Sequence, residues 1–213
     1  RLFGTDGVRG VANRELTPEL AFDLGRAGAA VLAGEVQHKP RILIGSDTRI
    51  SCGMLEAALA AGICAAGADA ILCGVVPTPA IAYLTCAQGC DAGVVISASH
   101  NSYEFNGIKF FNAEGYKLPD RVEDEIEAII ARREPSERPE GERIGRISRY
   151  EAAAADYAEH LKQTMGGDLT GLVIAMDCAN GAASAIAPGL FRDLGAQVLP
   201  LGVTPDGVNI NEN

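Results

Sequence analysis

The chain has 213 residues, of which 47% are hydrophobic and 5% aromatic, with 25 glycines and no tryptophan. These proportions favour a well-packed α/β protein and argue against disorder. The formal net charge of -10 disfavours nucleic acid and anionic membrane surfaces as partners, because phosphate groups select basic faces. No apolar run reaches the roughly 18 residues typical of a membrane span. No signal peptide is evident either, so we expect a cytoplasmic protein.

Helices and strands alternate along the first 130 residues. The Thr17-Pro18-Glu19 sequence predicts the start of a helix that runs to about residue 35, with Thr17 as its N-cap. Strands are predicted at 41–47, 69–74 and 92–97, and helices at 51–66, where Ser51 is the expected cap, and at 79–88. Residues 107–119 predict a hairpin, and residues 120–132 an amphipathic acidic helix. This alternation predicts an α/β fold with a mixed, mainly parallel sheet and helices on both faces.

The sequence predicts a second, similar α/β domain after a polar crossover at 133–147. We place the first domain at 1–147 and the second at 148–213, opening with a helix capped by Ser148. The same order of features recurs in 43–78 and 173–206: a strand that ends in Asp, a Gly-Ala pair, a second strand and a Gly-Val-X-Pro segment. This recurrence indicates a repeated βαβ unit. One such unit cannot bury both faces of a normal sheet, so either these residues dock on the first domain or the chain is a piece of a longer protein, and the second interpretation is favoured.

The six cysteines show no CxxC pair and no histidine at metal-site spacing. Cys86 and Cys90 lie four residues apart on a predicted helix, which weakly suggests a soft-metal pair. Core packing of both thiols is the favoured interpretation, because free cysteine behaves as a small hydrophobe.

The segment 93–111, GVVISASHNSYEFNGIKFF, begins as a buried strand and ends in small polar residues. Ligands of open α/β sheets bind beyond the carboxyl ends of the strands, which is where residues 97–102 are expected. Ser99 could cap a turn, act as a nucleophile or carry a phosphate. A serine hydrolase is disfavoured, because its nucleophile elbow needs Gly-x-Ser-x-Gly. Adjacent side chains in an extended segment also diverge, so His100 is a poor base for Ser99.

A phosphoryl carrier fits these residues better. A serine phosphate adds about -1.5 to -2 charge and needs cations and N–H groups around it. His100, Asn101 and Lys109 supply donors, and an Asn-Gly turn at 106–107 is expected to fold Lys109 back toward Ser99. A solvated strand lysine is the alternative for Lys109.

Two further segments combine glycine with charge. FGTDGVRG at 3–10 suggests a backbone that turns tightly near a ligand, and Arg9 could present a planar guanidinium to a phosphate. A plain glycine-rich loop is the alternative there. Asp47 and Arg49 in GSDTR could be catalytic, but a salt bridge within a turn is the favoured interpretation.

Together these motifs resemble the α-D-phosphohexomutase superfamily. ISASHNSYEFNGIKFF (96–111) resembles its phosphoserine loop, and FGTDGVRG (3–10) resembles its phosphoglucosamine mutase branch. GSDTRIS (45–51) and MDCANGAAS (176–184) match further segments of the family. The resemblance implies a heart-shaped enzyme of four domains, of which this chain carries the first and the opening of the second.

The resemblance also implies an activity and its site. The reaction interconverts glucosamine 6-phosphate and glucosamine 1-phosphate through a phosphoserine and a bound 1,6-bisphosphate. Mg²⁺ is implied as the cofactor, held by the Ser99 phosphate and by aspartates that lie outside these 213 residues. Glucosamine 1,6-bisphosphate is implied as the activator. A small phosphosugar is the implied partner, and a homodimer is left open. The implied catalytic residues are Ser99, His100, Lys109 and Arg9, and the implied substrate- or phosphate-binding residues are Asn101, Thr5 and Asp6.

Two departures from the family pattern affect this expectation. Ser102 stands where the family has a proline, which should loosen the loop without removing a chemical group. The family's Asp-x-Asp-x-Asp-Arg metal loop, sugar-recognition loop and C-terminal phosphate-binding domain are absent from these residues, so we expect the chain by itself to be inactive as a mutase. The alternatives are a phosphomannomutase or phosphoglucomutase, and a non-catalytic phosphosugar-binding module, which does not need a phosphorylatable serine.

Overall fold

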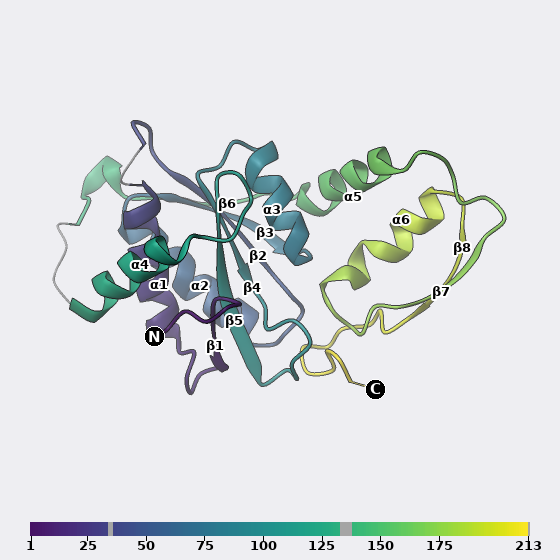
Figure 1. Cartoon of the computed structure of the whole chain (residues 1–213), viewed down its shortest axis with the longest axis horizontal. Coiled ribbons are helices and arrows are strands. Elements are labelled where there is room, and N and C mark those ends of the chain that lie inside the picture. The colour runs from purple at the N-terminus through teal and green to yellow at the C-terminus, as the bar shows by residue number, and fades with distance from the viewer. Residues whose placement is uncertain (34–35, 133–137, 213) are drawn as a thin grey trace.

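The computed structural model describes residues 1–33, 36–132 and 138–212. Its larger part is built on a six-stranded sheet in the order β1-β5-β4-β2-β3-β6 (Figure 1). The strands are β1 (Val8–Val11), β2 (Arg41–Ser46), β3 (Asp69–Val75), β4 (Ala92–Ile96), β5 (Phe105–Asn112) and β6 (Ile147–Arg149). β2 pairs in parallel with β3 and β4, β6 pairs in parallel with β3, and β5 is antiparallel to both β4 and β1. The expected mixed, mainly parallel sheet is therefore confirmed.

Helices cover both faces of this sheet. One layer holds α1 (Pro18–Ala33), α2 (Cys52–Ala65) and α4 (Asp120–Arg132), and the other holds α3 (Thr78–Ala87) and α5 (Ala153–Thr164). Successive side chains of a strand point to opposite faces, so β2 contributes to both cores. Ile42 and Ile44 pack under the first layer, whereas Leu43 packs with Leu84 of α3 under the second.

Local signals predicted some element boundaries well and others badly. Thr17 Oγ1 accepts a hydrogen bond from the Leu20 N–H at 3.2 Å, as expected of an N-cap, and α4 has the predicted bounds. Ser51 stands at the N-cap position of α2 as predicted, but its side chain makes no cap hydrogen bond and instead accepts one from Asn106 Nδ2 at 2.8 Å. Ser148 was wrongly predicted as a cap; it lies in β6, and α5 begins only at Ala153.

The structure contains a turn, not a full hairpin, at the predicted hairpin 107–119. Its first arm is β5, but its second arm makes only the isolated antiparallel bridge between Phe111 and Lys117. The Asn112 side chain stabilises the turn by accepting a hydrogen bond from the Tyr116 N–H at 2.8 Å. β5 makes its long pairings with β4 and β1 instead, which places it inside the sheet.

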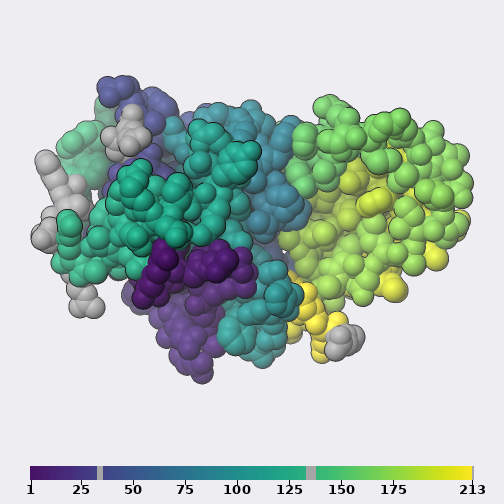
Figure 2. Space-filling model, in the orientation of Figure 1, coloured from purple at the N-terminus to yellow at the C-terminus, as the bar shows by residue number. Residues whose placement is uncertain are grey.

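A second, smaller sheet lies apart from the first. β7 (Val173–Asp177) pairs in parallel with β8 (Gln197–Leu201), and the short helices η2 (Ala182–Ala185) and α6 (Ala187–Asp193) connect them. The short helix η1 (Gly141–Arg143) precedes β6, and because β6 spans the predicted boundary at 147/148 the domain division stays a prediction. Figure 2 shows the second unit as a separate green and yellow lobe beside the first.

The two βαβ units share their backbone turns. Gly67 and Gly195, each just before the second strand of its unit, have φ of 92° and 96°. Gly74 and Gly202, in the Gly-Val-X-Pro segments, have φ of 69° and 58°. These are left-handed conformations that glycine adopts without steric cost, and their recurrence supports the predicted repeat.

The His160 ring of α5 stacks on the Tyr83 ring of α3, with centroids 3.7 Å apart, which joins the two helices of that layer. The second unit contacts the first through hydrogen bonds: the Ile50 N–H donates to the Gly207 carbonyl at 2.8 Å, and Thr48 Oγ1 donates to the Asn180 carbonyl at 2.6 Å. The segment 207–211, which we call the strap, therefore lies against the carboxyl end of the first sheet.

The cysteines are free thiols. Cys90 is buried as expected, but Cys86 is exposed, so the prediction of core packing is wrong for Cys86. Within the described ranges, no helix combines the length and the apolar character needed to cross a membrane.

Candidate functional site

The loop after β4 presents Ser99 at the carboxyl end of the sheet. Ser99 is exposed and has φ of 57°, a left-handed conformation that is uncommon for residues with a Cβ. Its N–H donates to Ser97 Oγ at 3.1 Å, and the Ser97 N–H donates to the Gly107 carbonyl of β5 at 2.9 Å. The turn thus projects Ser99 outward while its own backbone stays attached to the sheet.

A buried ion pair supports this loop from below. Asp47 and Arg49 are 4% and 2% exposed, and Arg49 Nε lies 2.9 Å from Asp47 Oδ2. Asp47 Oδ2 also accepts a hydrogen bond from Ser97 Oγ at 2.7 Å. The favoured interpretation of Asp47 and Arg49 as a salt bridge holds, but the pair also anchors the loop.

The Arg49 guanidinium reaches three backbone carbonyls of the loop. Its Nη2 donates to the carbonyls of Ser99 at 3.0 Å and Asn101 at 2.9 Å, and its Nη1 donates to the carbonyl of Ser102. These bonds fix the loop at the position where the family's proline is missing, so they offset part of the loosening expected from Ser102.

A buried thiol completes the layer under the loop. Cys52 Sγ lies 3.2 Å from Asp47 Oδ1, and Asn106 Nδ2 donates to the same sulfur at 3.3 Å. Burial, with the nearby Asp47 carboxylate, raises the pKa of the Cys52 thiol to about 12. The thiol is therefore protonated and inert at neutral pH.

A pocket of about 250 Å³ opens beside Ser99. It gathers five of the seven predicted site residues from three separate segments of the chain. Its lining consists of Asp6, Arg9, Thr78, Val95, Ser97, Ser99, His100 and Lys109. Thr5 lies in a neighbouring pocket formed by residues 1–7 and Arg9, and Asn101 contributes its carbonyl to the loop rather than its side chain to this pocket.

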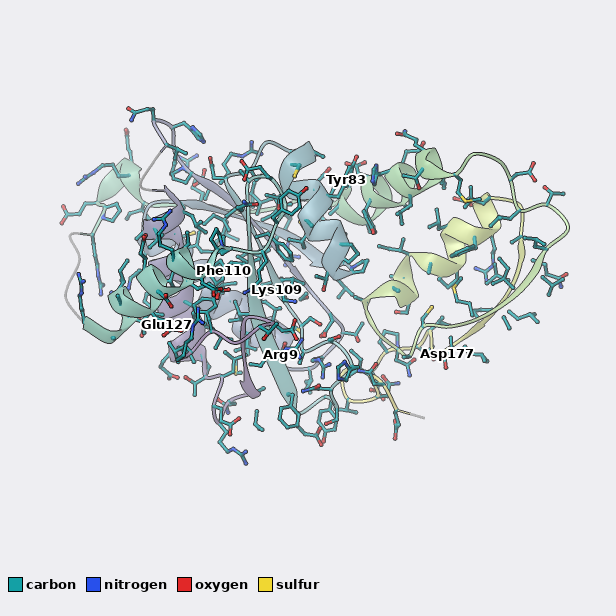
Figure 3. All side chains as sticks on the ribbon, viewed as in Figure 1. Arg9, Tyr83, Lys109, Phe110, Glu127 and Asp177 are labelled. Atoms are coloured by element: carbon teal, nitrogen blue, oxygen red, sulfur yellow. The ribbon has the colours of Figure 1, made fainter. Side chains whose placement is uncertain are left out.

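Strand register brings the two cations of the pocket together. Arg9 pairs with Gly107, and Lys109 follows two residues later on β5, so both side chains project from the same face (Figure 3). Gly107 leaves room between them, because a Cβ there would lie 2.9 Å from Arg9 Cγ and 2.8 Å from the Ser97 carbonyl oxygen. The pocket thus concentrates positive charge in an acidic protein.

Asp6 is the carboxylate nearest to these cations. Its two oxygens lie 3.4 Å from Lys109 Nζ and 3.5 Å from Arg9 Nη2. Arg9 Nε is buried and has no hydrogen-bond partner among the described residues. One carboxylate therefore faces two cations, which leaves the pocket with capacity for an anionic ligand.

The predicted turn at 106–107 was wrong, although Lys109 does face the site. Asn106 lies inside β5 and is fully buried, and its amide donates to Ser51 Oγ and Cys52 Sγ on the opposite face from Lys109. Lys109 is brought to Ser99 by the antiparallel pairing of β5 with β4, in which it lies opposite Val95. The chain reversal occurs in the loop between the two strands.

Sequence reasoning did not select Thr78, Ser97 or Asn211 as site residues. Thr78 begins α3, and Ser97 follows β4 directly; as the last residue of the predicted strand at 92–97 it could have been identified by that position. Asn211 contacts the loop across 112 positions of sequence. Within the described chain, no group of three or more His, Cys, Asp or Glu could hold a metal ion, so these residues alone do not form a metal centre.

Comparison with known proteins identifies the family. Residues 1–137 match the family model for phosphoglucomutase/phosphomannomutase, alpha/beta/alpha domain I. The phosphoglucosamine mutases of Caldicellulosiruptor saccharolyticus and Clostridium novyi are 61% and 62% identical to the chain, each over 100% of it. They are matched over 48% and 47% of their own length, so the chain spans about half the length of these curated relatives.

The fold comparison agrees. A phosphoglucomutase/phosphomannomutase family protein from Burkholderia thailandensis matches 97% of the chain and 44% of its own chain, with a TM-score of 0.81 and 27% identity. The matched residues 1–137 include both the loop at Ser99 and the segment at Arg9. The chain therefore belongs to the phosphoglucomutase/phosphomannomutase family.

Proposed function

We propose that the chain supplies the phosphoserine-bearing part of a mutase that interconverts glucosamine 6-phosphate and glucosamine 1-phosphate. The observation that carries this proposal is the position of Ser99, on a firmly anchored turn at the edge of a pocket that also contains Arg9 and Lys109. The sugar is inferred from the name of the relatives with about 60% identity, which are phosphoglucosamine mutases.

The proposed reaction has two phosphoryl transfers. In the first, the bond between phosphorus and Ser99 Oγ breaks, and a bond forms between phosphorus and a free hydroxyl oxygen of the sugar monophosphate. The proton of that hydroxyl replaces the phosphoryl group on Ser99, and the product is a 1,6-bisphosphate. In the second transfer, the other phosphoryl group moves to Ser99 Oγ, and the proton returns to the sugar.

The residues of the pocket suit this chemistry. Phosphoryl transfer depends on in-line positioning and on neutralisation of the phosphoryl oxygens. Arg9 offers a planar fork that can bind two oxygens, while Lys109 and His100 offer further donors on the same pocket. When the serine is phosphorylated, these donors replace water around the phosphate and so favour transfer to the sugar over hydrolysis.

Mg²⁺ and glucosamine 1,6-bisphosphate, as cofactor and activator, belong to the same proposal. A hard divalent ion binds phosphate oxygens and carboxylates. Among the described residues, a phosphate on Ser99 could provide one such ligand, but no acidic cluster lies beside it to complete a metal site. We therefore assign no step to the metal. The partner in the proposal is a small phosphosugar, and both a homodimer and a cytoplasmic location stay predictions.

An assay of the full-length protein with different sugar phosphates tests the proposal. Glucosamine 6-phosphate, glucose 6-phosphate and mannose 6-phosphate are compared by kcat/KM, with the Ser99→Ala variant as the control. We expect the highest kcat/KM with glucosamine 6-phosphate and no turnover by Ser99→Ala. A preference for glucose or mannose phosphate would support the other mutase activity instead, and turnover by Ser99→Ala would exclude the phosphoserine mechanism.

A further inference from the structure

The serine loop is held from two sides by side chains that lie far apart in sequence. Arg49 Nη2 donates to the carbonyls of Ser99 and Asn101 at 3.0 and 2.9 Å. Asn211 Nδ2 donates to the same two carbonyls at 3.1 and 2.9 Å. Each oxygen has two lone pairs and therefore accepts both bonds. Arg49 belongs to the first βαβ unit, whereas Asn211 belongs to the strap that follows the second one.

The second unit fixes the position of Asn211. The Asn211 N–H donates to the Ala179 carbonyl at 2.9 Å, in the loop after β7. Its φ of 57° is left-handed, a conformation that asparagine tolerates better than most residues. The strap is also tied to the first sheet, because the Gly207 carbonyl accepts from the Ile50 N–H. In Figure 1 the yellow strap lies beside the teal loop that follows β4.

Asn211 touches the loop but lies outside the pocket. Its amide contacts the backbone of the turn, and the pocket that contains Ser99 has no lining residue from the strap. Loss of this amide would leave every donor of the pocket in place. It would remove one bond to the Ser99 carbonyl, which helps to keep that carbonyl turned inward and the Ser99 side chain turned outward, and one bond to the Asn101 carbonyl.

We propose that Asn211 is a positioning residue for Ser99, and that through it the loop is correctly aimed only when the second unit is docked on the first. The proposal rests on the proposed function for its effect on turnover, but its structural part is independent of it. In the docked state the amide holds Ser99 in its left-handed conformation. Displacement of the second unit withdraws the amide and loosens the turn.

Two substitutions of Asn211 distinguish the effect of its side-chain amide from the effect of its backbone conformation. Asn211→Asp has the same shape and tolerance of positive φ but replaces the donor by a carboxylate oxygen, which repels the two carbonyls. Asn211→Gly has no side chain and adopts positive φ freely, so it removes the bonds without strain. The matched control is Asn13→Asp, since Asn13 is also an exposed asparagine with positive φ (61°) but lies at the β1–α1 connection.

The full-length variants are compared by two measurements. Hydrogen exchange of the peptide that contains residues 97–105 reports on the loop, and steady-state kinetics with glucosamine 6-phosphate reports on turnover. For both Asn211 variants we expect faster exchange in this peptide alone. We also expect kcat to fall about tenfold, the effect of losing hydrogen bonds worth about 1.4 kcal/mol, with KM changed less than about twofold. Asn13→Asp should change neither.

The two measurements distinguish failure of this inference from failure of the proposed function. Unchanged exchange in the loop peptide of Asn211→Gly, which is expected to fold, would overturn the inference even if the enzyme is a mutase. Faster exchange with an unchanged kcat would overturn the positioning role in turnover. If the wild-type protein has no mutase activity, the proposed function fails, and the exchange data alone then support or overturn the structural role of Asn211.

Discussion

The buried guanidinium of Arg49 lies 3.0 Å from the carbonyl oxygen of Ser99, measured from its Nη2. A charged donor fixed by Asp47 thus contacts the backbone of the residue that is proposed to carry the phosphate. Because the bond goes to the carbonyl, the Ser99 side chain is left free to face the pocket. Support and chemistry are therefore provided by different residues, which makes them separable by mutation.

Replacement of Arg49 should destabilise the protein strongly. Arg49→Met leaves the 4%-exposed Asp47 carboxylate without its guanidinium partner and the Ser102 carbonyl without its side-chain donor, and it leaves the carbonyls of Ser99 and Asn101 with the Asn211 amide alone. We expect the free energy of unfolding to fall by about 3–5 kcal/mol, the cost of breaking one side of a buried ion pair. Urea unfolding measures this loss. Arg14→Met, at an exposed position, is the control, and an equal effect of both variants would contradict the role of Arg49.

Substitutions at Ser99 should affect stability and chemistry in different ways. Glycine relieves the left-handed conformation at φ 57°, whereas alanine retains its steric cost of about 1–2 kcal/mol. We therefore expect Ser99→Gly to be more stable than Ser99→Ala by about 1 kcal/mol in thermal or urea unfolding. Both variants should lack phosphoryl transfer. Equal stability of the two would mean that the turn relaxes when the hydroxyl is removed.

Lys109 is expected to contribute to transfer rather than to folding. Its Nζ lies on the pocket and contacts only the partly exposed Asp6 carboxylate among the described residues. Lys109→Met should lower kcat/KM about 10- to 100-fold, as for loss of one charged hydrogen bond to phosphate, with little change in unfolding free energy. Lys162→Met removes a lysine that pairs with Asp193 away from the pocket, and its kcat/KM should stay near wild type.

Cys52 should make the free energy of unfolding depend on pH in the alkaline range. Burial raises the pKa of its thiol from the ordinary 9.0 to about 12, so the unfolded chain releases this proton at lower pH than the folded one. The contribution of Cys52 to stability is therefore constant below pH 9 and declines as pH rises from about 9 to about 12. Unfolding of wild type and Cys52→Ala across this range measures the decline, which should be smaller in the variant but not absent, because burial also raises the pKa of Cys73 to about 12.

Alkylation provides a second check on the same thiol. Iodoacetamide reacts with thiolates, so at pH 8 the exposed Cys86 should be modified first and Cys52 only after unfolding. Modification of Cys52 in the folded protein at the rate of Cys86 would contradict its burial under the loop.

Short-range patterns predicted the elements that depend on short-range contacts. The acidic first turn and apolar stripe of 120–132 define α4 by themselves, and the Thr17 cap contacts a residue three positions away. Asn106 and Ser51 show the limit of this reasoning. Each has a strong local preference, for a turn and for a cap, yet the two side chains bond to each other across 55 positions. Tertiary contact overrode both preferences.

The same distinction applies to the site. Ser99, His100, Arg9 and Lys109 could be selected because their own segments are unusual, and the strand register then brings them to one pocket. The residues that hold the loop act across 50 and 112 positions of sequence, from Arg49 and Asn211. No local pattern specifies such contacts, so only the folded structure reveals them.

The most direct test of this account is to locate the phosphate. The full-length protein is incubated with glucosamine 1,6-bisphosphate and Mg²⁺, digested, and mapped by mass spectrometry, with Ser99→Ala and Ser97→Ala treated in parallel. We predict phosphate on Ser99 in the wild type, none in Ser99→Ala, and phosphate still on Ser99 in Ser97→Ala. A folded protein that stays unmodified at Ser99, or carries the phosphate on another residue, would contradict it.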